Sequence, residues 1–71
     1  MMDENERAEL ISRMFALLTM KFENGAAEAV KGQGRGKDAQ TIEQLANQLQ
    51  AIGEEIAIVA GAARALMEIF G

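Results

Sequence analysis

The sequence contains no cysteine, histidine, proline, tryptophan or tyrosine, and its only aromatic residues are three phenylalanines. The absence of cysteine excludes disulfides and thiolate metal sites, and the absence of histidine removes the usual ligands of zinc, haem and di-iron centres. A chain of 71 residues without such cross-links gains only about 3 to 5 kcal/mol of net stability from one hydrophobic core. We therefore expect oligomerisation to stabilise the protein.

Long apolar runs are also missing. The longest run in the C-terminal half without a polar or charged residue is residues 56–63, far short of the roughly 20 apolar residues that span a bilayer. The N-terminal stretch MMDENERAEL is acidic and has neither the basic nor the apolar region of a signal peptide. These two features predict a soluble protein of the cytoplasm.

The balance of charge limits the choice of partner. The net charge is −4, whereas a chain whose main role is to hold a phosphate backbone is normally basic. Acidic residues crowd the N-terminus, and the basic residues Lys31, Arg35 and Lys37 cluster in one short segment. Nucleic acid is therefore a disfavoured partner.

The residues that are present favour helices. The composition is 49% hydrophobic and rich in Ala, Glu, Gln, Leu, Ile and Met, which predicts an all-α fold. The segment KGQGRGKD has three glycines in five positions, so we place the loop at 32–37. This loop divides a single domain, 1–71, into a first helix at about 4–31 and a second at about 38–70. The turn dipeptide Asn24-Gly25 leaves open a break in the first helix, although its apolar pattern continues to Ala29.

Both predicted helices carry an apolar stripe with alternating spacings of three and four residues. In the first helix the stripe comprises Ile11, Phe15, Leu18, Phe22, Gly25 and Ala29. In the second helix it comprises Ile42, Leu45, Leu49, Ile52, Ile56, Val59, Ala63, Leu66 and Phe70, which is the pattern of a coiled-coil seam. Asp38 is the expected N-cap of the second helix, and Thr41 with Gln44 offers a capping-box alternative one turn later.

Two helices joined by a short loop fold back on each other as an antiparallel hairpin. A turn centred near Arg35 places Gly25 opposite Leu45 and Leu18 opposite Ile52. A hairpin of two helices has no interior, however, and its apolar surface here is wider than one helix contact can cover. A second copy of the chain is the expected cover.

Apolar residues that the contact between the two helices would leave uncovered indicate where this second copy binds. They are Leu10, Met14 and Leu17 beside the first stripe, and Leu66, Met67, Ile69 and Phe70 at an end of the second helix that extends past the first. We expect a dimer of hairpins that forms an antiparallel four-helix bundle. Its predicted interface comprises Leu10, Met14, Leu17, Gly53, Ala57, Gly61, Leu66, Met67 and Phe70.

Two of these interface residues are glycines inside a helix. Each glycine costs roughly 1 kcal/mol relative to alanine, and a ridge of small residues can offset this cost by letting another backbone come close. The ridge comprises Gly53, Ala57, Gly61 and Ala65. We interpret it as a close-packing surface, and the alternative is that the glycines are only tolerated. A separate strip away from the seam, Ile58, Ala62 and Ile69, is a further oligomer contact or a surface for a different protein.

No motif in the sequence predicts catalysis. The segment GQGRGKDAQT has the glycines and lysine of a phosphate-binding loop, but Lys31 and Asp38 stand where the Walker pattern needs glycine and serine or threonine. Glu54 and Glu55 are adjacent on a helix, point about 100° apart and do not face one site. No histidine is present to activate Ser12. We expect no enzyme activity, no catalytic residue, no cofactor and no metal.

The function predicted from these features is a homo-oligomeric helical module for protein interaction or assembly. The alternative is a small nucleic-acid-binding hairpin dimer, whose layout is similar to that of Rop-type RNA-binding four-helix bundles, without a matching residue motif. Its contacts would be Arg7, Arg13, Lys21, Lys31, Arg35 and Lys37. A membrane-surface element is disfavoured because the polar face is acidic.

Overall fold

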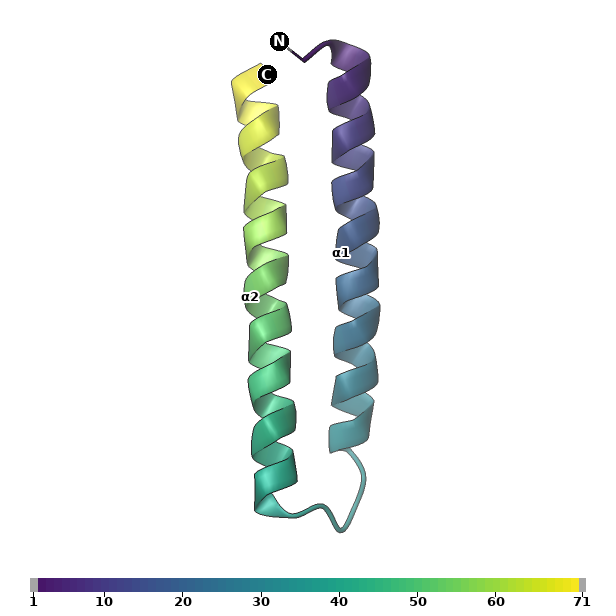
Figure 1. Ribbon diagram of the computed structural model, residues 1–71, viewed down its shortest axis with the longest axis vertical. Helices are drawn as coiled ribbons and strands as arrows, with labels where there is room; N and C mark the ends of the chain where they lie inside the picture. Colours follow the sequence, from purple (N-terminus) through teal and green to yellow (C-terminus); the bar gives the residue numbers. More distant parts are fainter. Residues whose placement is uncertain (1, 71) are drawn as a thin grey trace.

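The computed structural model describes the backbone of residues 2–70 and the side chains of residues 2–68. Two helices, α1 (Glu4–Gly32) and α2 (Ala39–Phe70), lie antiparallel as a hairpin (Figure 1). The hairpin is a rod with extents of 53 × 15 × 15 Å. We call the end with the connection the loop end and the other the open end. No helix within residues 2–70 combines the length and the apolar character that a membrane span requires.

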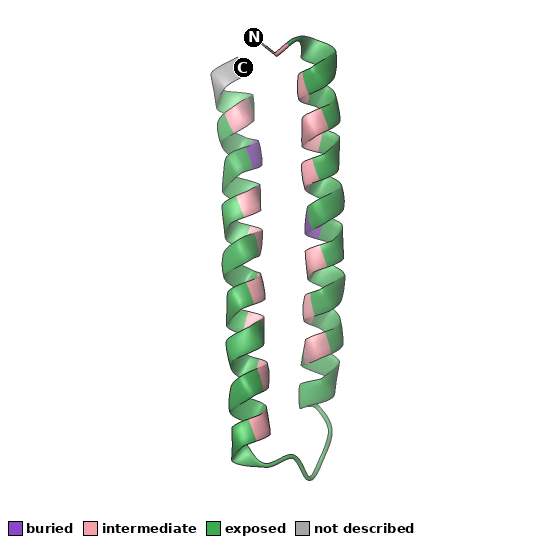
Figure 2. Cartoon of the chain, viewed as in Figure 1, coloured by how far each residue is buried: buried purple, intermediate pink, exposed green. Residues whose placement is uncertain are grey.

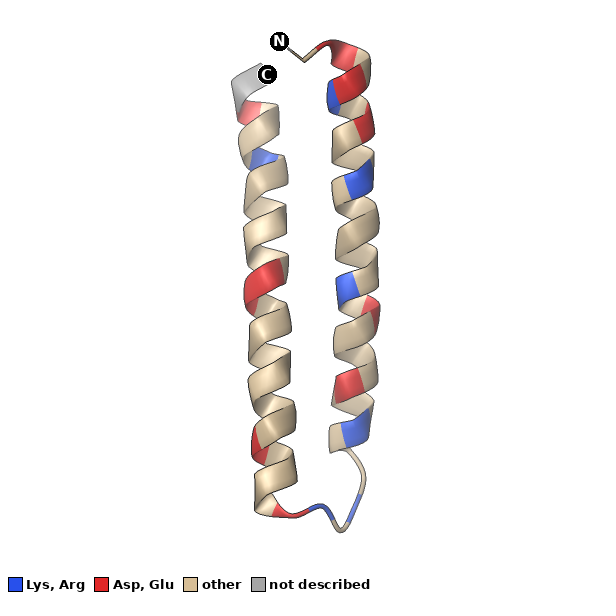
Figure 3. Ribbon diagram, viewed as in Figure 1, with Lys and Arg blue, Asp and Glu red and all other residues tan. Residues whose placement is uncertain are grey.

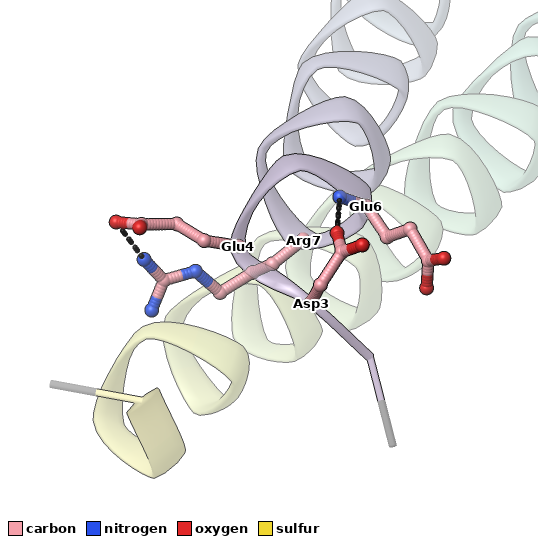
Figure 4. A network of polar contacts seen from close by, with 4 residues as sticks. All are labelled: Asp3, Glu4, Glu6 and Arg7. Atoms are coloured by element: carbon pink, nitrogen blue, oxygen red, sulfur yellow. Dashed lines mark hydrogen bonds and ion pairs between the residues drawn. The ribbon is translucent and has the colours of Figure 1, made fainter.

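Helix α1 begins at an acidic cap. The carboxylate of Asp3 accepts a hydrogen bond of 2.7 Å from the N–H of Glu6, and Glu4 lies 3.6 Å from the guanidinium of Arg7 (Figure 4). Acidic side chains in the first turn and Lys31 in the last turn also match the helix dipole. The helix continues without a break through Asn24 and Gly25 and ends at Gly32.

The connection is short and depends on one glycine. The N–H groups of Gln33 and Gly34 donate to the carbonyls of Val30 and Lys31, which closes the last turn of α1. Gly36 then adopts a φ of 79°, in the left-handed region that glycine enters without strain. The chain needs this turn to reverse its direction towards α2.

Asp38 begins α2, as its sequence context predicts. Its carboxylate accepts a hydrogen bond of 2.7 Å from the N–H of Thr41, and its carbonyl accepts one of 3.1 Å from the N–H of Ile42. The capping-box alternative one turn later is not the one adopted. The N–H and then the hydroxyl of Thr41 hold the pKa of the Asp38 carboxyl below its ordinary value, because both hydrogen bonds favour the charged form.

The two helices meet along a seam of buried and half-buried residues (Figure 2). On α1 the seam comprises Arg7, Leu10, Ile11, Met14, Leu18, Lys21, Gly25 and Glu28. On α2 it comprises Thr41, Leu45, Leu49, Ile52, Ile56, Val59, Ala63 and Leu66. Among the described side chains only Leu18 and Ala63 are buried, at 8% and 6% exposed. The α2 seam matches the predicted stripe from Leu45 to Leu66, but the predicted Ile42 is 42% exposed and Thr41 lies in the seam instead. The α1 seam departs further from its predicted stripe.

The predicted α1 stripe was wrong at three positions, because Phe15, Phe22 and Ala29 are exposed. Phe15 and Phe22 are 57% and 60% exposed, and Met14 and Lys21 take their places against α2. The apolar surface of α1 is wider than one helix contact, so α2 covers only one edge of it. The ion pair between Lys21 and Glu55 lies on that edge.

The predicted register was also wrong. A Cβ added at Gly25 would lie 3.5 Å from Cγ2 of Ile52, and one added at Gly32 would lie 4.0 Å from Cδ1 of Leu45. Gly25 therefore faces Ile52 instead of Leu45, a shift of seven residues, or about 10 Å. Large side chains do pack against glycine at the loop end, as predicted, but with different partners.

This register removes the predicted overhang at the open end. Met67 lines one groove with Ile11 and Phe15, so this part of α2 lies beside α1 and does not extend past it. The side chains of Ile69 and Phe70, which the same prediction included, lie outside those described. The first turns of α2 extend instead beyond Gly32 at the loop end (Figure 1).

Candidate functional site

The surface that remains uncovered is the main feature of the hairpin. Its accessible area is 5459 Å², whereas a compact protein of 7.7 kDa exposes about 4,300 Å². Its radius of gyration is 16.4 Å, against about 11 Å for a compact chain of this length. Each chain therefore exposes about 1,100 Å² more than a compact monomer would.

Three of the exposed large hydrophobic side chains, Phe15, Phe22 and Met67, lie on one flank of the hairpin, which we call the Phe flank. It comprises Ala8, Phe15, Phe22 and Ala29 of α1, and Ala46, Gly53, Ala60 and Met67 of α2, and all eight are exposed. On each helix these positions follow the seam and recur every seven residues, so they form a continuous strip beside it. None of the eight residues is polar or charged.

A groove joins the two helices on this flank. It has a volume of about 220 Å³ and is lined by Ile11, Phe15, Leu18, Ala60, Ala63, Arg64 and Met67. Its one charged lining residue, Arg64, is exposed and forms an ion pair of 3.0 Å with Glu68. Phe15 and Met67 are 57% and 50% exposed, so their apolar surfaces face solvent in the single hairpin.

The opposite flank is mixed in character. Towards the loop end it carries a groove of about 430 Å³ lined by Asn24, Ala27, Glu28, Gln48, Ala51 and Ile52. Towards the open end it carries Leu17, at 36% exposed, and the exposed Ala62. Asn24, Glu28 and Gln48 interrupt the apolar residues of this flank towards the loop end, so it lacks the continuous apolar strip of the Phe flank.

The residues predicted as an oligomer interface are distributed over several surfaces. Leu10, Met14 and Leu66 are half-buried in the seam. Gly53 and Met67 belong to the Phe flank, and Ala57 lies next to it in the helical pattern. Leu17 lies on the opposite flank, and Gly61 is exposed on the outer side of α2. The side chain of Phe70 is outside those described.

The other predicted surface is equally divided. Ile58 is 70% exposed towards the outer side of α2, and Ala62 is exposed on the opposite flank. The side chain of Ile69 is outside those described. The two described residues of this predicted partner surface, Ile58 and Ala62, therefore lie on different sides of α2 and do not form one patch.

The glycine ridge makes no close contact inside the hairpin. A Cβ added at Gly53 or Gly61 would meet no described atom within 4 Å. The ridge advances by four residues at each step, so it drifts from the Phe flank at Gly53 to the outer side of α2 at Gly61. A packing role for these glycines therefore has to involve another chain.

Three exposed residues of the Phe flank were not predicted to be part of the oligomer interface: Phe15, Phe22 and Ala60. The sequence does contain a signal for them, because the apolar surface of α1 extends over both Met14 and Phe15. A helix contact covers only part of such a surface. What the sequence left open was which part stays exposed.

The charged residues form local pairs and do not build a basic face (Figure 3). Five of the seven basic residues form ion pairs: Arg7 with Glu4, Arg13 with Glu9, Lys21 with Glu55, Lys31 with Glu28 and Arg64 with Glu68. Lys21 is 19% exposed in the seam, so it does not present its charge as a surface contact would. Arg35 and Lys37, in the loop, form no ion pair within the described residues.

The carboxylates are separated as well. Glu55 pairs with Lys21 across the seam, whereas Glu54 accepts a hydrogen bond of 3.4 Å from Gln50 on its own helix. The two side chains therefore turn towards different neighbours and do not form an acid and base pair. Residues 2–68 contain no group of three or more acidic side chains placed to hold a metal ion.

The geometry thus presents an apolar flank and no assembled catalytic constellation within the described side chains. Comparisons of the chain with models of protein families, with curated proteins and with solved structures found no match.

Proposed function

We propose that the protein is a non-enzymatic, homo-oligomeric assembly module whose unit is a four-helix bundle of two hairpins. The observation that carries this proposal is the uncovered Phe flank, which exposes Phe15, Phe22 and Met67 to solvent. Monomeric soluble proteins rarely leave a continuous apolar strip of this length uncovered. A second copy has an equally long apolar flank, so packing the two flanks together removes both from water.

The size of the uncovered surface fits a stable dimer. If each chain covers its excess of about 1,100 Å², the dimer buries about 2,200 Å² in total. Permanent homodimers bury about 2,000 Å² or more, and most crystal contacts bury less than about 800 Å². The second copy also provides the interior that a two-helix hairpin lacks.

The charge distribution supports assembly over nucleic-acid binding. A protein that holds a phosphate backbone needs several basic side chains on one face. Here the basic side chains are mostly paired with carboxylates, and the two loop residues Arg35 and Lys37 are the main exception. Within the described residues, no cluster of unpaired basic side chains outside the loop favours the nucleic-acid alternative.

Sedimentation equilibrium of the intact chain tests the proposal. We expect a mass of about twice 7.7 kDa at micromolar concentration. The double variant Phe15→Ser, Phe22→Ser should raise the dissociation constant at least tenfold, because it removes the largest side chains of the flank. Serine and phenylalanine have similar helix propensities, so the substitution tests the contact and not the helix.

The matched control is Val30→Ser. Val30 is 64% exposed on α1 but lies outside the Phe flank, so its replacement should leave the mass unchanged. A folded monomer of 7.7 kDa whose mass does not change with concentration would contradict the proposal. Equal weakening by Val30→Ser would show that the flank has no special role.

A further inference from the structure

We propose that two hairpins pack through their Phe flanks about a two-fold axis parallel to the helices, with both loops at the same end. Phe15 of each copy then lies over Ala60 of the other, and Phe22 lies over Gly53 of the other. This inference rests on the proposed homo-oligomeric function and specifies the surface and the orientation of the partner copy.

The first observation is the size pattern along the flank. The groove brings Phe15 beside Ala60, and the contacts Lys21 to Glu55 and Gly25 to Ile52 place Phe22 at about the height of Gly53. At the ends of the flank, the same register places Ala8 near Met67 and Ala29 near Ala46. Each large side chain on one helix is therefore level with a small residue on the other.

The second observation is the space at Gly53. An added Cβ would meet no described atom within 4 Å, although glycine weakens the helix at this position. Within the hairpin nothing requires a glycine here. A phenyl ring from a second copy would use this space, which explains the glycine on the Phe flank.

Two symmetric arrangements stack these flanks and keep all neighbouring helices antiparallel. With the axis parallel to the helices, α1 of each copy packs on α2 of the other. Residues at the same position along the long axis of the hairpin then meet. With the axis across the helices, the loops lie at opposite ends and α1 packs on α1. The choice between them depends on which side chains meet.

The size pattern favours the parallel axis. In that arrangement each phenylalanine meets a small residue, Ala60 or Gly53, so large and small side chains interlock. In the other arrangement Phe15 meets Phe22 of the second copy, and Gly53 meets Ala60. That would crowd one side of the bundle and leave the other side loosely packed, and both defects are destabilising.

Surface charge does not reverse this choice. The parallel axis brings the two acidic open ends together, but Glu4 and Glu9 already pair with Arg7 and Arg13. These groups are on the surface, where water and salt screen their repulsion. Packing along the flank therefore decides the orientation.

The absence of cysteine makes the orientation directly measurable. The variant Arg35→Cys carries one spin label per chain, in the loop. If the loops lie at one end, the two labels are separated by roughly one or two hairpin thicknesses of 15 Å; if the loops lie at opposite ends, the separation approaches the hairpin length of 53 Å. A label at Ala16→Cys, exposed near the middle of α1, is the control and should give a short separation in either arrangement.

A pair of glycine variants supplies a second measurement. Gly53→Leu should raise the dissociation constant of the dimer roughly ten- to hundredfold, because leucine would meet Phe22 of the other copy. Gly61→Leu is the matched control, since Gly61 is equally open in the hairpin but lies on the outer side of α2, and it should leave the constant unchanged. Adding Phe22→Ala to Gly53→Leu should restore at least part of the affinity.

The outcomes separate the two proposals. A dimer with a long loop-to-loop distance, or one that tolerates Gly53→Leu as well as Gly61→Leu, overturns the orientation and leaves the assembly function standing. A monomeric mass with no dipolar coupling for either label overturns both.

Discussion

The two halves of the hairpin are held together in different ways. In the open half, Ile11 and Leu18 of α1 pack against apolar residues of α2, and both buried residues, Leu18 and Ala63, lie there. In the loop half, α2 presents large side chains such as Ile52, but α1 presents glycine and charged residues. Along one seam, the packing therefore changes from apolar layers to large side chains of α2 against glycine and charged residues of α1.

The two halves are expected to contribute differently to the stability of the hairpin and to the specificity of its register. Buried apolar area stabilises the open half, because each buried aliphatic side chain contributes about 1.5 to 3 kcal/mol. In the loop half, Lys21 occupies a seam position and pairs with Glu55 on the other helix. A charged residue at such a position selects one register at some loss of stability. We therefore expect the loop half to specify the alignment that the open half stabilises.

The largest expected effect comes from truncating the open half. Leu18→Ala should lower the free energy of unfolding by about 2 to 3 kcal/mol, since Leu18 is 8% exposed and its loss leaves a cavity. Leu45→Ala in the loop half should cost about 1 kcal/mol, because Leu45 is only half-buried beside Gly32. Urea unfolding at one fixed protein concentration measures both. Equal losses would show that the two halves are packed alike.

A smaller effect is expected from removing the charge of Lys21. Lys21→Met keeps the length of the side chain and should change the free energy of unfolding by less than about 1 kcal/mol, because Glu55 is 54% exposed and remains hydrated. The register should become less specific, since methionine also packs against Leu49 in the alternative alignment. Nuclear Overhauser contacts between Gly25 and the methyl groups of Ile52 report this change. A single undiminished set of contacts would show that Lys21 does not select the register.

The smallest effect concerns the start of α2. The hydrogen bonds from Thr41 lower the pKa of Asp38 in the folded state, so their stabilisation is present above the ordinary carboxyl pKa and is lost as pH falls through the lowered value. Asp38→Asn keeps a capping side chain and removes this titration. The melting temperatures of the two proteins should differ by at most a few degrees at pH 7, and the difference should change only in acid. Glu43→Gln, an exposed carboxyl nearby on α2, is the control.

Features that depend on neighbouring residues were predictable from the sequence. The glycines of KGQGRGKD predicted the loop, and the apolar periodicity predicted two helices that pack as a hairpin. The position of Asp38 directly before the second helix predicted that it caps this helix. In each case the physical cause lies within a few residues along the chain: backbone freedom, helical spacing or a local hydrogen bond. Helix α2 was the clearest case, because the alternating spacing of its large aliphatic residues predicted the seam from Leu45 to Leu66.

The α1 seam was not predictable in the same way. Its apolar surface covers about half of the helix, so the periodicity allows Phe15 and Phe22, or Met14 and Lys21, to face α2. The candidate site depends on this choice, because the residues left out of the seam form the Phe flank. The pattern showed that an excess of apolar surface exists but not where it lies.

By itself, then, the sequence determined an all-helical chain, its reversal at a glycine-rich loop and the cap at Asp38, because local energies decide these features. Only the tertiary structure decided the register and the exposed flank. These features follow from which side chains of two distant helices fit together, and several pairings satisfy the same periodicity. In the register adopted, Lys21 pairs with Glu55 and Ile52 packs against Gly25, and this register leaves Phe15 and Phe22 uncovered.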